Sequence, residues 1–204
     1  TAPAYAVTKH YDIQHPNDDL ETVTFVDGFG RAVQVKKDGV VTSAAKGNSA
    51  KDENVMIVSG RNVYDAFGRV AKAFYPTTEG TGSKSTFNKS FDNVSPTVTV
   101  YDVLDRATSV TLPDNSTTTT AYTVDNSSHA LVTTVTDALH NVQATHTNGS
   151  GKTLKTIQKS GPDGEITTSF EYDGIQRLVR VTDTEGNVTT STYDMGDRRT
   201  EVNH

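Results

Sequence analysis

The 204-residue chain contains no cysteine, which excludes a disulfide framework and a thiolate metal site. It also lacks any apolar run near the roughly 18 residues that a membrane-spanning helix requires. No signal peptide is visible. The chain opens with Thr1 and stops within a repeated motif, so we expect it to be an excised piece of a longer protein, with any targeting signal outside it.

Basic charge is scarce as well. The chain has 19 Lys and Arg residues and 25 Asp and Glu residues, which gives a formal charge of −6. Nucleic-acid binding requires a basic patch, so we expect no nucleic-acid partner. Charges of both signs are interspersed, and hydrophobic residues make up 33% of the chain. This mixture, rich in threonine, predicts strands that pair well and face water on at least one side.

What the chain does contain is one short motif written repeatedly: Tyr-Asp, two variable residues, Gly and Arg. In each copy a cation follows the acidic position by four residues. A sixth, degenerate copy runs from Asn148 to Lys152. The residues that we single out as the structural repeat motif are Asp27, Gly30 and Arg31; Tyr64, Asp65, Gly68 and Arg69; Tyr101, Asp102 and Arg106; Tyr172, Asp173 and Arg177; and Tyr193, Asp194 and Arg198. Such repetition indicates an architecture built from copies of one supersecondary unit.

The best copy separates Tyr172 from Tyr193 by 21 residues and encodes two antiparallel strands with two tight turns. We therefore predict an all-β fold: a twisted antiparallel meander of about ten or more strands, most of 5–8 residues. Hairpin turns should fall at 27–31, 65–69, 102–106, 173–177 and 194–198. No helix is expected.

Each motif position has a structural explanation. The Asp can accept bonds from amides of its own turn, and the Arg four residues later can pair with it. The Gly permits a left-handed or bulged backbone. The tyrosines, recurring at one place in each hairpin, are expected to stack along a ladder across strands. We interpret Asp65 and Arg69 as a turn staple, with a catalytic carboxylate or ligand clamp as the lesser alternative.

The spacing of the copies is irregular over residues 1–150 and regular over 161–199. Segments 42–54 and 78–85 read as long solvated loops between copies. Because the motif keeps its phase across them, we predict a single region, 1–204, formed by one continuous sheet.

The sequence contains no recognisable catalytic motif. The six histidines are scattered, and no nucleophile elbow or phosphate loop is present. We predict no enzymatic activity, no metal and no cofactor.

The motif, its phase and its 21-residue step resemble the YD repeat of the Rhs family. The stretch Phe25–Arg31 with Lys36, Lys37, Asp38 and Gly39 looks closer to the insecticidal toxin complex B component and its SpvB-type relatives. The resemblance implies a β-sheet ribbon that spirals into a hollow shell around a variable C-terminal toxin. This chain holds too few repeats to close a shell, and it lacks the Asp-Pro-rich motif where such shells cleave themselves.

We therefore expect a non-enzymatic shell or scaffold segment of an exported, secreted or cell-surface bacterial protein, whose partners are further repeats and a C-terminal effector of its own parent chain. The alternative is a glycan-binding, adhesive module with exposed Tyr64, Tyr75, Tyr101 or Tyr172. We also expect bare strand edges near Tyr5–Tyr11 and Arg198–Val202, through which an excised fragment would self-associate.

Overall fold

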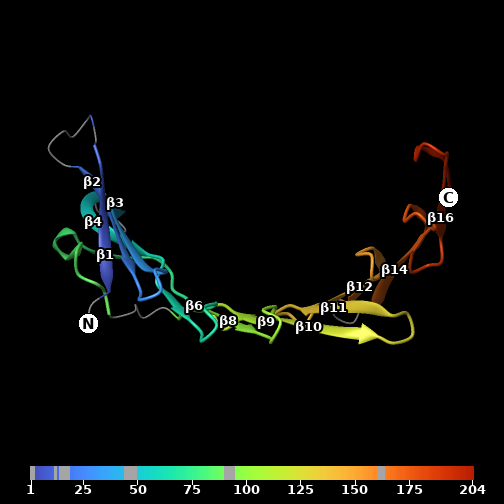
Figure 1. Ribbon diagram of the computed structural model, residues 1–204, viewed down its shortest axis with the longest axis horizontal. Helices are drawn as coiled ribbons and strands as arrows, with labels where there is room; N and C mark the ends of the chain where they lie inside the picture. The colour runs from blue at the N-terminus through green and yellow to red at the C-terminus, as the bar shows by residue number, and fades with distance from the viewer. Residues whose placement is uncertain (1–2, 12, 14–18, 44–49, 90–94, 160–163) are drawn as a thin grey trace. The chain divides into compact units, whose positions relative to one another are not determined.

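The computed structural model describes residues 3–11, 13, 19–43, 50–89, 95–159 and 164–204 (Figure 1). Within these residues the regular structure is almost entirely β, with seventeen strands and one short 3-10 helix, η1, at Thr81–Ser83. The all-β prediction is confirmed. The chain divides into two compact units, the first covering residues 1–100 and 111–115, the second covering 101–110 and 116–204.

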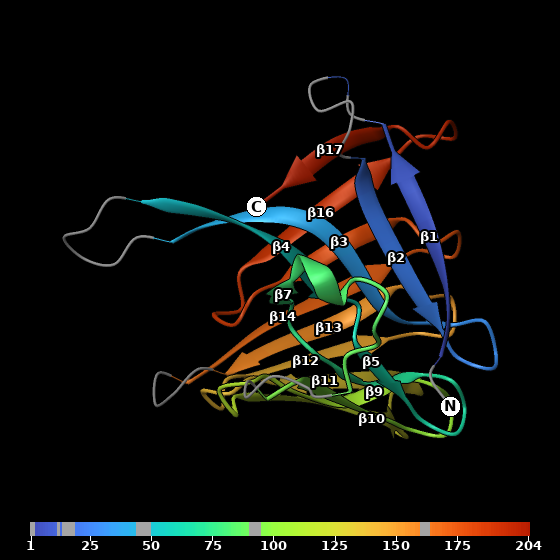
Figure 2. The same ribbon diagram turned by 90° about the vertical axis from the view of Figure 1, so that its left-hand side faces the viewer.

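A five-stranded antiparallel sheet lies in the first unit, in the order β1-β2-β3-β4-β7 (Figure 2). Its strands are β1 at Ala4–His10, β2 at Leu20–Val26, β3 at Ala32–Ser43, β4 at Lys51–Ser59 and β7 at Thr77–Gly80.

A twelve-stranded sheet has the order β17-β16-β15-β14-β13-β12-β11-β10-β9-β8-β6-β5. Its strands are β5 at Asn62–Tyr64, β6 at Val70–Ala73, β8 at Thr97–Tyr101, β9 at Ala107–Thr111, β10 at Thr117–Asp125, β11 at Ala130–Thr136, β12 at Val142–Thr147, β13 at Thr153–Lys159, β14 at Glu165–Tyr172, β15 at Leu178–Thr182, β16 at Val188–Tyr193 and β17 at Arg199–Asn203.

The presence of two sheets corrects the expectation of one continuous sheet. The break falls after β4, because β5 does not continue the pairing and β4 pairs instead with β7. Gly60, between β4 and β5, has a φ of +62°, so the backbone leaves the sheet at a residue that tolerates the left-handed region.

Both segments expected to be solvated loops contain strands. Strand β3 continues to Ser43 and β4 begins at Lys51, so the ends of the 42–54 segment extend a hairpin, while residues 44–49 lie outside the described part. Segment 78–85 forms most of β7 and all of η1. Its polar residues bond to buried groups of the five-stranded sheet, which the sequence pattern alone did not indicate.

The core of the five-stranded sheet lies on one face of β2, β3 and β4. Val23, Phe25, Met56 and Val58 are at most 1% exposed. Figure 2 shows η1 over β3 and β4. There Lys36, which is fully buried on β3, donates to the carbonyl of Ser83 at 2.9 Å. Segment 79–88 therefore covers this core, and we call it the cover segment.

The second unit has a much thinner core. Its buried apolar residues among the described positions are Ala130, Val132 and Ala144, and most other strand positions are half-buried. Strands β10 to β17 pair consecutively and antiparallel, so each strand contacts the next one in sequence. A single layer of this kind depends on its turns for much of its order.

Candidate functional site

The repeated motif folds into one turn geometry, which we call the staple turn. In eight described turns the amide of the first residue donates to the carbonyl of the fifth, and the amide of the fourth donates back to the carbonyl of the first. This is a three-residue hairpin loop: a tight turn followed by one left-handed residue. The first residues of these turns are Asp27, Asp65, Asp102, Asp137, Asn148, Asp173, Asp183 and Asp194.

The side chain of the first residue organises each staple turn. One oxygen, Oδ1, accepts the amides of the third and fifth residues at 2.8–3.1 Å in all eight turns. In the five Asp–Arg turns the second oxygen, Oδ2, accepts the Nε of the Arg at 2.7–2.8 Å. In these five turns the Asp thus satisfies three donors of its own turn, as the predicted staple requires.

The fourth residue of each staple turn is left-handed, with φ between +62° and +86°. The sequence motif assigned this role to glycine, and Gly30 and Gly68 fill it. Four other turns place Asp105, His140, Gln176 and Asp197 there. Asp and His enter this region more readily than most non-glycine residues, so the geometry persists where the glycine is lost.

Two staple turns lie outside the Tyr-Asp motif and end in Asn instead of a cation. At Asp137 and Asp183 the fifth residue is Asn, and its Nδ2 donates to the Asp Oδ2 at 2.8 Å. Successive turns of the antiparallel meander alternate between the two ends of its strands. The two Asn turns lie at one end, and the other end carries the turns at 148–152, 173–177 and 194–198. The spacing Asp-x-x-x-Asn was the signal that could have identified them.

Four tyrosines lie beside the cation of a staple turn, a contact that the predicted ladder of stacked rings did not include. The cation of one staple turn lies over the tyrosine of the following hairpin: Arg31 over Tyr64 at 4.2 Å from the ring centroid, Arg106 over Tyr122 at 4.0 Å, Lys152 over Tyr172 at 5.9 Å and Arg177 over Tyr193 at 4.9 Å. These distances fall within the range of cation–π attraction. Tyr122 lies 21 residues after Tyr101 but is followed by Thr123, so it stands outside the Tyr-Asp motif.

The tyrosine hydroxyls make a second link between successive turns. Tyr64 donates to the carbonyl of Ala32, Tyr172 to that of Thr153 and Tyr193 to that of Leu178, at 2.8–3.0 Å. In each case the acceptor directly follows the cation that lies over the same tyrosine ring. Each tyrosine therefore fixes the position of one turn relative to the next.

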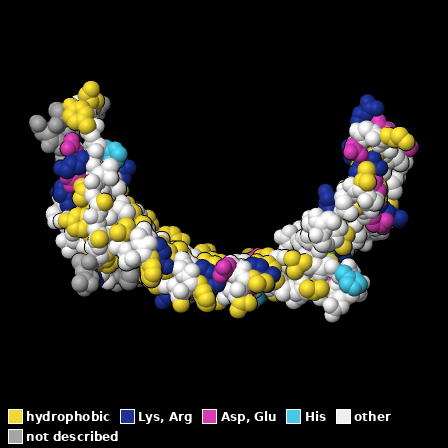
Figure 3. Space-filling view, viewed as in Figure 1, with side chains coloured by type: hydrophobic (Ala, Val, Ile, Leu, Met, Phe, Trp, Pro, Cys, Tyr) yellow, Lys and Arg dark blue, Asp and Glu magenta, His cyan; other side chains and the backbone are white. Residues whose placement is uncertain are grey.

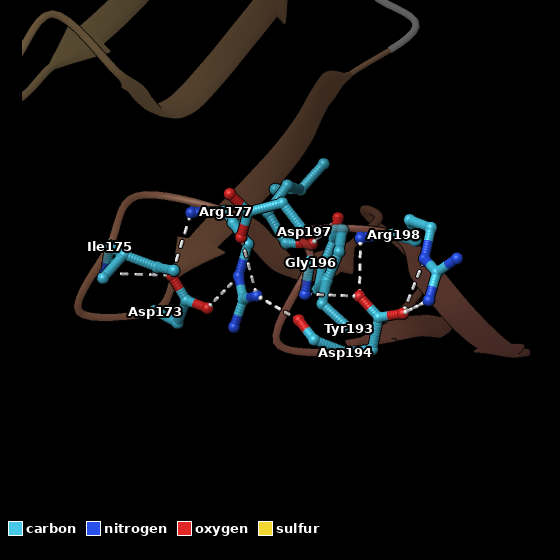
Figure 4. Close-up of polar contacts among 9 residues, drawn as sticks. Asp173, Ile175, Arg177, Tyr193, Asp194, Gly196, Asp197 and Arg198 are labelled. Carbon is cyan, nitrogen blue, oxygen red and sulfur yellow. Dashed lines mark hydrogen bonds and ion pairs between the residues drawn. The ribbon is translucent and has the colours of Figure 1, made fainter.

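Arg177 illustrates the full linkage (Figure 4). Its Nε donates to Asp173 within its own turn, and its Nη1 donates to the carbonyl of Asp194 and to Oδ1 of Asp197, both at 3.1 Å. One guanidinium, 26% exposed, thus connects two staple turns and covers the ring of Tyr193.

The same linkage joins the two sheets within the first unit. Arg31 follows β2 of the five-stranded sheet, whereas Tyr64 and Gly68 belong to the β5–β6 hairpin of the other sheet. The Nη1 of Arg31 lies only 3.1 Å from where a Cβ on Gly68 would stand. The series of cation–tyrosine contacts therefore crosses the break between the sheets, which explains why the motif keeps its phase there.

The electrostatics of the staple turns favour ionised aspartates. The pKa of Asp173 lies below its ordinary 3.8. The largest cause is the hydrogen bond from the backbone amide of Arg177, and the Arg177 guanidinium also lowers the pKa. Desolvation of the carboxylate acts in the opposite direction but is outweighed. Asp194 behaves alike, its pKa lowered first by the amide and then by the guanidinium of Arg198. At Asp183 the first cause of the lowered pKa is the Asn187 side chain. These carboxylates act as acceptors, an arrangement suited to holding turns.

Other kinds of site are not evident in the described ranges. No group of three or more His, Asp or Glu residues there could hold a metal ion. No helix in this part of the chain is long and apolar enough to cross a membrane. On the face drawn in Figure 3, side chains of both charge signs are interspersed, as the sequence indicated.

The fold of this chain is found in solved structures. The chain is similar to the crystal structures of TcdB2-TccC3-TEV (TM-score 0.60, 17% identity), TcdB2-TccC3-Cdc42 (0.58, 16%) and TcdB2-TccC3 without hypervariable C-terminal region (0.58, 16%). Each match covers 97% of this chain but only 12% of the other. The chain therefore shares the fold of a small part of a toxin-complex protein. No curated protein matches.

Two family models match the sequence. Residues 172–204 match the RHS Repeat model, over the last two Tyr-Asp copies, and this agrees with the YD-repeat resemblance. Residues 1–118 match the model described as Domain of unknown function (DUF6443). Since the second match spans more than half of the chain, the protein belongs to the DUF6443 family and carries an RHS repeat at its C-terminal end.

Proposed function

We propose that this chain is a non-enzymatic wall segment of an Rhs-type shell, in an exported or cell-surface bacterial protein whose remaining repeats complete the wall around a C-terminal effector. The observation that carries the proposal is the repeated staple turn linked from copy to copy by cation–tyrosine contacts. Such linkage extends a sheet by identical steps, which suits a wall better than a single catalytic pocket.

The similarity to TcdB2-TccC3 structures supports the proposal because each of those chains is several times longer than this one. The chain would then contribute one stretch of a larger wall. Its outermost strands agree with this role: β1 and β17 end their sheets, so each has a side that further strands could pair with. As a separate fragment, the chain should self-associate through β1 or β17.

The alternative, glycan binding on a tyrosine platform, has less support. Tyr64 and Tyr172 are half-buried, each has a cation over its ring, and each donates its hydroxyl to a carbonyl. Of the four tyrosines named for this role, Tyr75 is the one that is exposed, at 49%. One exposed ring does not make a platform.

Limited proteolysis of the complete parent protein tests the wall proposal. Sequence downstream of the repeats should resist protease in the native protein and become sensitive when Arg106 and Arg177 are both changed to Ala. The matched control is Arg180→Ala, which removes a 46%-exposed arginine with a looser 3.7 Å ion pair to Glu171. Equal cleavage of the downstream region in native and denatured parent protein would contradict enclosure.

A further inference from the structure

A buried amine and a side-chain amide share one carboxylate in the first unit. Lys36 is 0% exposed, and its Nζ donates to Oε2 of Glu79 at 2.5 Å. The amide Nδ2 of Asn88 donates to Oε1 of the same carboxylate. Glu79 therefore holds both nitrogens at once, one from β3 and one from the end of the cover segment.

The backbone of Asn88 is fixed independently of this cluster. Its amide donates to Oε1 of Gln34 at 2.9 Å, and its carbonyl accepts Nε2 of Gln34 at 3.2 Å. Gln34 is itself fully buried on β3, two residues before Lys36. The two contacts hold the backbone of Asn88 against β3 without using the side chain of Asn88 or of Lys36.

The Nζ of Lys36 also donates to the carbonyls of Ser83 at 2.9 Å and Thr86 at 2.5 Å, so the cover segment surrounds the amine with acceptors, while aromatic and aliphatic side chains lie beyond them. The ring centroid of Phe25 lies 5.9 Å from Nζ of Lys36, and Phe87 packs edge-on against Phe25 at 5.4 Å. The neighbouring Val23 and Met56 are fully buried on the same sheet. A lysine amine becomes a nucleophile only after it gives up a proton, so an acceptor must lie within hydrogen-bond reach of Nζ.

Glu79 is suited to move a proton between the two groups. Desolvation acts to raise its pKa, but hydrogen bonds from Lys36, Ser83 and Asn88 outweigh that influence and hold the pKa below its ordinary 4.5. It therefore begins as a carboxylate that can accept a proton from Lys36. Proton transfer along that hydrogen bond leaves the lone pair of Nζ directed toward the carboxylate that also binds Asn88.

We propose that Lys36 and Asn88 form an intramolecular isopeptide bond, with Glu79 as the catalytic proton carrier. The Nζ of Lys36 attacks Cγ of Asn88, and protonated Glu79 stabilises the developing oxyanion. The Cγ–Nδ2 bond then breaks as Glu79 passes its proton to the departing nitrogen. The second proton that Nζ loses on becoming an amide also passes through Glu79 to the ammonia, which leaves as ammonium ion. Lysine ammonium plus amide thus give a substituted amide plus ammonium ion, so atoms and charge balance without an external reagent.

The bond would tie β3 covalently to the cover segment. It closes a loop from Lys36 to Asn88 that includes β4 and β7, so the cover could not leave the core even when noncovalent contacts fail. The reaction occurs once per molecule, and it depends neither on shell assembly nor on an enclosed effector.

Mass spectrometry of the denatured, full-length protein tests the proposal. Trypsin should release residues 32–37 joined to residues 85–89, with a mass lower than the sum of the two peptides by one ammonia. Fragmentation should locate the link at Lys36 and Asn88. This localisation also separates it from ammonia loss at the Asn148–Gly149 step, where a cyclic imide would have the same mass change.

The variants sharpen the result. Glu79→Gln and Asn88→Ala should return both peptides unlinked, whereas Lys37→Arg, at the exposed neighbouring position, should keep the link. Unlinked peptides 32–36 and 85–89 from the unmodified protein, which require cleavage after a free Lys36, would overturn the proposal, whatever the variants do. A link that persists in Glu79→Gln would overturn the role of Glu79.

Discussion

The five-stranded sheet and the meander of the second unit are built from the same kinds of residue but held in different ways. The first buries Val23, Phe25, Met56 and Val58 almost completely beneath the cover segment. The second buries little beyond Ala130, Val132 and Ala144, yet it carries most of the staple turns. Where a covered core is missing, order is supplied at the strand ends by hydrogen bonds and cation–tyrosine contacts.

This contrast separates two uses of polar residues. In the first unit Gln34 and Lys36 are buried and have specific partners in the cover segment, so they position one layer on another. In the second unit the polar residues of the turns are half-exposed and repeat at fixed spacing. Loss of the first set should open one place, whereas loss of the second should weaken a series of equivalent places.

The largest effect is expected in the covered core. Phe25→Ala should destabilise the first unit by about 3–5 kcal/mol, because it leaves a cavity beneath the cover segment. The matched control is Phe29→Ala at a staple turn, where the ring is 86% exposed and the change should stay within about 0.5 kcal/mol. Urea unfolding of both variants measures the difference. Similar destabilisation by the two would show that the core assignment is wrong.

Acidification should act next, and mainly on the meander. The staple aspartates have folded-state pKa values below 3.8, so their contribution is complete above 3.8 and declines as pH falls through the lower folded values. Peptide-resolved hydrogen exchange should therefore show loss of protection at the staple turns of residues 116–204 before the five-stranded core opens.

Asp173→Asn is the control for this prediction. Asn148 already shows that an amide oxygen can accept both turn amides. The substituted turn should keep its backbone geometry but lose its response to acid at residues 173–177. An unchanged acid response in that peptide would mean that Asp173 is not the titrating group.

A smaller effect is expected at the glycine of one staple turn. Gly68→Val should cost about 1–2 kcal/mol, because Gly68 has a φ of +82° and a Cβ there would crowd Arg31. Gly149→Val should be nearly neutral, since Gly149 has open space around it and Gly151 holds the left-handed position of that turn. Thermal unfolding compares the two, and equal shifts would contradict the assignment of the fourth position.

The smallest effect is expected at a linking tyrosine. Tyr193→Phe removes the 2.8 Å hydrogen bond to the carbonyl of Leu178 and should cost about 0.5–1.5 kcal/mol. Tyr75→Phe, at a 49%-exposed ring, serves as control. Exchange of the 194–198 amides should rise in the first variant alone. No change there would show that the hydroxyl does not link the turns.

The five motif turns and the hairpins beside them could be predicted from the sequence because they depend on residues close together in the chain. All five turns predicted from the motif, such as 65–69 and 173–177, are present. The carboxylate of Asp65, for example, satisfies donors no more than four residues away. The spacing of residues within each motif was therefore enough to predict the geometry of these turns.

The cover segment could not be predicted in the same way. Glu79, Ser83 and Asn88 are polar and lie near glycines, which is typical of a solvated loop. Their structural role depends on Lys36 and Gln34, more than forty residues earlier. In addition, β3 buries these two polar residues while the intervening Val35 is only half-buried, which reverses the usual alternation. Only the three-dimensional arrangement could reveal that pairing.

The consecutive pairing of β10 to β17 has a kinetic consequence. Each hairpin closes a short loop, so the meander has low contact order and can form stepwise, one strand after another, as the chain leaves the ribosome. The five-stranded sheet must wait for β7 and the cover segment to return to β3 and β4, a slower search over a longer loop. During synthesis the N-terminal core would therefore stay incomplete until residues 77–88 have emerged, whereas each later hairpin would be nearly finished on arrival.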